Sequence, residues 1–139
     1  MKFLAAALAL MCCACASLPE TLTVRAEQSQ YSPALSSTPG IRLRPIFVPP
    51  SGVNVEYHWS ADFGSFVSWN PPAYKVKPLG SDFVATEGAL YWTYDPALAS
   101  ARKPVVTVVI EARDADTGKV LSRAKLKLDW DGDTARVRD

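Results

Sequence analysis

Apolar and polar residues alternate with a period of two along most of this chain, which is the pattern of half-buried β-strands. The clearest runs span residues 53–59, 90–94, 106–112 and 120–128, with shorter ones at 22–26 and 41–48. Pro45 interrupts the run at 41–48, and because proline cannot donate to a β-ladder we expect a bulge or a sheet edge there. The best helical candidate is a short piece at 96–101 that Asp95 could cap.

Successive side chains of a strand point to opposite faces, so each run divides into an inner and an outer set. In VEYHWS, Trp59 belongs to the apolar set and is predicted to anchor the core, whereas His58, the single histidine, falls on the polar face. The last long run predicts an inner face of alternating residues: Val120, Ser122, Ala124, Leu126 and Leu128.

Turn residues separate these runs, as in DADTGK at 114–119, which predicts a hairpin. The stretch 29–40, rich in Ser, Thr and Pro, is predicted to be a loop, and residues 130–139 a polar tail. Seven to eight short strands with regular turns predict an all-β fold, an antiparallel two-sheet sandwich in a single domain of residues 17–139.

The first 16 residues have the organisation of a signal peptide. Lys2 provides the positive start, an apolar run follows from Phe3 to Met11, and small residues precede the polar stretch. The apolar run is too short to span a bilayer, which needs about 20 residues. The sequence therefore predicts an exported chain.

All cysteines lie at the end of this signal, and two kinds of processing remain open. Cleavage after Ala16 by a general signal peptidase would leave a free chain starting at Ser17. Alternatively, LALMCCAC resembles a bacterial lipoprotein signal, which implies a lipid on Cys15 or, as the alternative, on Cys13. Two or three acyl chains would tether the domain stably to a membrane.

The composition excludes several classes of function. Without Lys2 the fifteen basic residues become fourteen and balance the fourteen acidic ones, so the net charge predicts no attraction to nucleic acid or to an anionic membrane surface. One histidine and no cysteine after Cys15 leave too few ligands for zinc and no thiol nucleophile. The chain also lacks the Gly-x-Ser-x-Gly, Walker and dinucleotide-binding motifs. We therefore expect a protein that is not an enzyme and needs no cofactor.

The run VEYHWSADFGSF, followed by LYWTYDP and PVVTVVIEARDADTG, resembles the immunoglobulin-like and PKD-like domains of bacterial surface proteins. The matching residues are Tyr57, Trp59, Thr107, Val109 and Asp114. This resemblance implies an immunoglobulin-like sandwich that binds other components of the cell envelope, with a protein as the expected partner.

Two further groups of residues are candidates for binding. The aromatic residues Trp69, Tyr74 and Tyr91 would form a flat strip of exposed rings if the domain were a carbohydrate-binding module, which is the alternative function. Two acidic loops are weak candidates for calcium, although neither has the spacing of an EF-hand. Their carboxylates belong to Asp114, Asp116, Asp129, Asp131 and Asp133.

Overall fold

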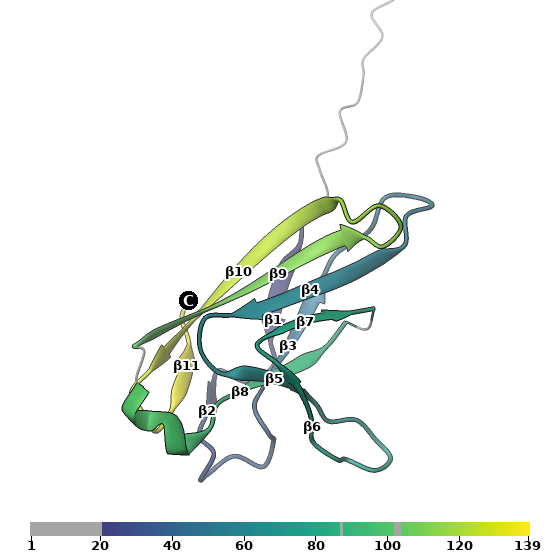
Figure 1. The fold of residues 1–139 in the computed structure, drawn as a ribbon. Coiled ribbons are helices and arrows are strands. Elements are labelled where there is room, and N and C mark those ends of the chain that lie inside the picture. Colours follow the sequence, from purple (N-terminus) through teal and green to yellow (C-terminus); the bar gives the residue numbers. More distant parts are fainter. Residues whose placement is uncertain (1–20, 87, 102–103) are drawn as a thin grey trace, which may run out of the picture.

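The computed structural model describes residues 21–86, 88–101 and 104–139, which form two antiparallel sheets packed face to face (Figure 1). The five-stranded sheet has the order β1-β3-β8-β5-β6 and the six-stranded sheet the order β2-β11-β10-β9-β4-β7. The strands are β1 Thr23–Ala26, β2 Gln30–Tyr31, β3 Ile41–Ile46, β4 Val55–Ala61, β5 Ser65–Ser68, β6 Lys77–Gly80, β7 Asp82–Ala85, β8 Leu90–Thr93, β9 Val105–Asp114, β10 Val120–Trp130 and β11 Ala135–Val137.

This architecture confirms the all-β prediction, with 52% of the described residues in strands. The described part of the chain contains eleven strands rather than seven or eight. The additional strands have two to four residues, which is too short for the two-residue period to stand out in the sequence.

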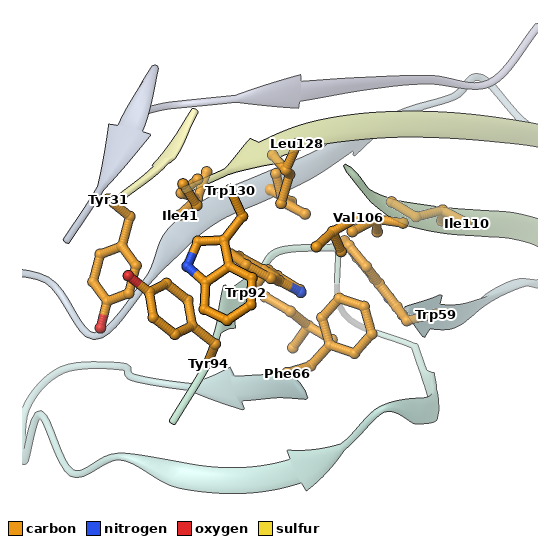
Figure 2. Close-up of a cluster of buried hydrophobic side chains, with 14 of the residues drawn as sticks. Tyr31, Ile41, Trp59, Phe66, Trp92, Tyr94, Val106, Ile110, Leu128 and Trp130 are labelled. Atoms are coloured by element: carbon orange, nitrogen blue, oxygen red, sulfur yellow. The ribbon is translucent and has the colours of Figure 1, made fainter. Parts of the chain in front are cut away.

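Large apolar side chains fill the space between the sheets (Figure 2). Trp59 from β4 is fully buried, as its position in the alternation predicts, and its ring meets that of Phe66 edge-on at a centroid distance of 5.6 Å. Trp92 and Ile110 contribute further buried surface from β8 and β9. Burial on this scale is the main source of stability in a domain without disulfides.

Pro45 lies in β3 opposite Val24 of β1, and the register between the two strands is unbroken. On the other side, β8 pairs only with Ile41–Leu43. At Pro45 the strand therefore pairs with β1 but not with β8, as a residue of an edge strand would. A proline is tolerated there because it has no N–H to donate to a second neighbour.

The chain passes from one sheet to the other between β4 and β5, through a tight turn at Phe63 and Gly64. Gly64 has a φ of 76°, in the region that favours glycine, and a Cβ atom there would lie against the Thr93 carbonyl oxygen and the Trp92 ring. The Trp92 indole N–H donates a hydrogen bond to the carbonyl oxygen of Phe63 over 2.9 Å, which fastens this turn to β8.

Two segments expected to be irregular contain short strands. The predicted loop 29–40 includes β2, and the predicted tail 130–139 includes the buried Trp130 and the strand β11, which pairs with both β10 and β2. A second correction concerns Val120, expected on the inner face, which is 43% exposed because the register shifts between Val120 and Ser122.

Both predicted local motifs are present. Residues Pro96–Ala101 form a 3-10 helix, η1, and the Asp95 carboxylate accepts a hydrogen bond from the backbone N–H of Ala97 over 2.9 Å. The segment 114–119 closes the β9–β10 hairpin, with Gly118 at a φ of 74°. The Asp114 carboxylate stabilises this turn by accepting a hydrogen bond from the backbone N–H of Asp116.

The start of β1, the loop before β4 and the β9–β10 hairpin lie together at one end of the sandwich (top of Figure 1). Two hydrogen bonds connect them, from Leu22 N–H to the Ser122 hydroxyl and from Ala115 N–H to the Asn54 carbonyl. Cys13 and Cys15 lie outside the described residues. Among the described residues, no helix has the length and apolar character needed to cross a membrane.

Candidate binding face

The outer face of the five-stranded sheet carries two apolar side chains that are buried although they point away from the core. Tyr91 of β8 and Val67 of β5 are cross-strand neighbours, and they are only 9% and 4% exposed. The residues that flank Tyr91, Leu90 and Trp92, belong to the core between the sheets. Something other than the second sheet must therefore cover this outer face.

The cover is the segment 69–76, which connects β5 to β6. The ring of Trp69 lies between those of Tyr91 and Tyr74, at centroid distances of 5.8 Å and 5.0 Å. Its indole N–H donates to the backbone carbonyl of Tyr74 over 2.7 Å, while the N–H of Tyr74 donates to the carbonyl of Asn70 over 3.0 Å. These bonds close the segment on itself and hold Trp69 over the sheet, where it forms a small apolar cluster outside the main core.

The three aromatic residues predicted for binding thus come together, but not as a flat strip. Trp69 makes an angle of 59° with Tyr74 and of 82° with Tyr91, so no common plane exists. Tyr91 is buried rather than exposed, which corrects the sequence expectation, and Trp69 is half-buried. Only Tyr74, at 54% exposure, presents most of its ring to solvent.

Three arginines continue the same outer face beyond the aromatic cluster. Arg42 of β3 is the cross-strand neighbour of Tyr91, and Arg44 faces Arg25 of β1 directly. Glu27, just after β1, accepts hydrogen bonds from Arg42 at 3.1 Å and from Arg44 at 2.7 Å. Partial burial opposes ionisation of Glu27, but the two guanidinium groups outweigh it and lower the pKa of the carboxyl group.

Two of these arginines border a shallow hollow of about 560 Å³ that is lined by Arg25, Ala26, Glu27, Arg44 and Ile46. Sequence reasoning missed this feature because it used only the net charge of the chain. Alternation within the runs 22–26 and 41–48 places Arg25, Arg42 and Arg44 on the polar side of both strands. The sequence pattern did not show that these two strands pair, and this pairing brings the three guanidinium groups together.

The outer face of the six-stranded sheet is different, because most of its charges are paired with one another. Glu111, 8% exposed, binds both Arg113 and Arg123, and Arg113 also donates to Nδ1 of His58 over 2.8 Å. Nε2 of His58 lies 2.8 Å from the Asp82 carboxylate. His58 therefore does not simply face solvent, as the sequence suggested. From β4 it contacts Asp82 of β7 on one side and Arg113 of β9 on the other.

This arrangement determines what His58 can do chemically. Arg113 can only donate, so Nδ1 of His58 accepts and the neutral ring carries its proton on Nε2, toward Asp82. Both ring nitrogens are engaged, which leaves no lone pair to activate a nucleophile. In the same network, the hydrogen bond from Arg113, followed by that from Arg123, lowers the pKa of Glu111 despite its burial.

Three of the five weak calcium candidates, Asp114, Asp129 and Asp131, already accept hydrogen bonds from turn N–H groups or from arginines. Asp131 accepts the backbone N–H groups of Thr134 and Asp133, and these bonds together with Arg136 lower its pKa to about 2. Asp129 is bound by Arg138, and Asp114 caps its hairpin. Across the part of the chain that the structure describes, no three His, Cys, Asp or Glu side chains gather in a group that could hold a metal ion.

Neither family models, curated proteins nor solved structures gave a match to this chain.

Proposed function

We propose that the protein is an exported, non-enzymatic β-sandwich module that a lipid on Cys15 tethers to a membrane. The module contacts another component of the bacterial cell envelope through the outer face of its five-stranded sheet. The observation that carries this proposal is the contrast between the two outer faces. Charges are mostly paired on the six-stranded sheet. On the five-stranded sheet, Glu27 pairs with two of the three arginines, beside a segment that exposes Tyr74.

The order of the strands supports a further part of the proposal, that the sandwich is immunoglobulin-like and belongs to a class that contains many binding modules. The strand order β1-β3-β8-β5 corresponds to A-B-E-D of that fold, and β10-β9-β4-β7 to G-F-C-C′. The chain departs from it by visiting the D-like strand β5 before the C′-like strand β7. Because one fold serves many functions, the proposal rests on the outer face and not on the strand order.

Intact mass measurement tests the anchor. We expect the product purified from an exporting bacterial host to carry acyl chains, and a Cys15→Ala variant to lack them. Cys13→Ala is the matched control, and loss of the acyl mass in that variant alone would move the anchor to Cys13. A wild-type chain that begins at Ser17 without lipid would refute the tether.

A photo-crosslinking residue placed at position 74 tests the binding face in living cells. Because Tyr74 is half-exposed on this face, we expect an adduct there and none from the same residue at position 84, which is similarly exposed on the six-stranded sheet. Equal adducts from both positions would contradict a specific face. An adduct with a glycan would favour the carbohydrate-binding alternative through Tyr74.

A further inference from the structure

The outer face of the five-stranded sheet combines unbalanced positive charge with exposed apolar side chains. Arg25 and Arg44 are directly opposed, and like charges in that position destabilise a sheet. Glu27 compensates Arg42 and Arg44, and no ion pair with an acidic residue is formed by Arg25 within the described ranges. The face therefore keeps a net positive charge although the whole chain is nearly neutral.

Apolar residues are exposed on the same face. Ile46, the last residue of β3, falls on the outer side of that strand and is 49% exposed, and Val48, two residues further along the chain, is 66% exposed. The segment that covers the aromatic cluster adds Tyr74 and Val76, both more than half exposed. Basic, aliphatic and aromatic side chains on one surface are the composition of proteins that lie in the interface of a membrane.

The position of this face relative to the anchor points to the same partner. Thr23, the first residue of β1, is eight residues after Cys15, so at most about 28 Å of extended chain separates the lipid from the sheet. Arg25 and Ile46 lie in the two strands at that edge of the sheet. A short tether keeps them at a high effective concentration beside the lipid headgroups.

We infer that the outer face of the five-stranded sheet lies on the anionic headgroups of the membrane that holds the lipid anchor. This inference rests on the proposed tether. Arg25 and Arg44, which border the hollow described above, donate hydrogen bonds to lipid phosphates, and Ile46 and Val48 enter the headgroup region. Since the attraction of a basic residue to an anionic leaflet is modest, each arginine strengthens binding about fivefold.

Arginine footprinting of the acylated wild-type protein tests the inference without any variant. The protein is reconstituted into vesicles of phosphatidylcholine alone or with about 30% phosphatidylglycerol, treated with phenylglyoxal and analysed by mass spectrometry. We expect Arg25 and Arg44 to react about fivefold more slowly in the anionic vesicles only, and high salt to abolish this protection. Arg123 and Arg136, on the other sheet and similarly exposed, are internal controls that should not change.

Equal reaction of Arg25 and Arg44 in both kinds of vesicle would overturn the inference. Protection by added polygalacturonate, with none in anionic vesicles, would also overturn it and assign the face to an anionic glycan.

Flotation of the unacylated Cys15→Ala protein with the same vesicles tests whether the face binds lipid when the anchor is absent. Arg25→Gln combined with Arg44→Gln should weaken binding to anionic vesicles about 25-fold. Lys125→Gln with Lys127→Gln, which removes the same charge from the other sheet, should have little effect. If mass spectrometry refutes the tether but the arginine variant still binds more weakly than the lysine variant, the face binds lipid without an anchor. If the tether is confirmed and the two double variants bind equally, only the assignment of the face fails.

Discussion

At the scale of single residues, Gly64 fixes the passage between the two sheets. A Cβ atom there would lie 2.8 Å from the Trp92 ring and closer still to the carbonyl oxygen of Thr93, at a φ that side chains avoid. We expect Gly64→Ala to cost about 2–5 kcal/mol, combining backbone strain with overpacking, as measured by urea unfolding. Gly132→Ala, also at positive φ but with nothing within 4 Å of the added atom, should cost only about 1–2 kcal/mol. Equal losses would contradict the close packing at Gly64.

Glu111 links stability to pH at the same scale. Its pKa in the folded protein is below the ordinary value of 4.5, so the folded state binds its proton less tightly than the unfolded state does. The stabilisation is complete above about pH 4.5 and is lost as the pH falls through the lower, folded-state pKa. We expect Glu111→Gln to flatten the fall in unfolding free energy between about pH 5 and pH 3. Glu56→Gln, which removes a different carboxylate from the same outer face, is the control. A Glu111→Gln slope equal to that of the wild type would exclude the role of Glu111.

At the scale of elements, the segment 69–76 acts as a cover for the five-stranded sheet. Trp69→Ala would remove both the ring over Tyr91 and the hydrogen bond to the Tyr74 carbonyl, so we expect a loss of about 2–3 kcal/mol in urea unfolding and faster proteolysis of this segment. Tyr74→Ala keeps the backbone carbonyl and removes a ring that is mostly in solvent, so its cost should stay below about 1 kcal/mol. A larger loss from Tyr74→Ala than from Trp69→Ala would mean that the segment is held from its outer side.

A comparison of the long strands with the segment 69–76 shows which features of the fold could be predicted from the sequence. Long runs with a period of two predicted β4, β8, β9 and β10 and the burial of Trp59, because alternation alone sorts side chains between core and solvent. Tyr91 falls on the outer side of its strand by that rule, as it does in the structure. Its burial follows from a loop that folds back over the sheet, and no local pattern encodes such a contact. The three aromatic residues could therefore be chosen as a group, but their exposure could not be predicted.

At the scale of the whole molecule, net charge is a poor description of this protein. Fourteen basic and fourteen acidic residues follow Lys2 and cancel in sum. Strand pairing nevertheless places Arg25, Arg42 and Arg44 on one face, where Glu27 pairs with only two of them. We expect the purified protein, in non-ionic detergent if acylated, to be retained on a cation-exchange column at pH 7, because adsorption depends on the most positive face and not on the total. Arg25→Gln with Arg44→Gln should elute at clearly lower salt than Lys125→Gln with Lys127→Gln, although both pairs change the net charge equally. Identical elution would show that charge is spread evenly over the surface, and the outer face of the five-stranded sheet would then have no electrostatic preference for an anionic partner.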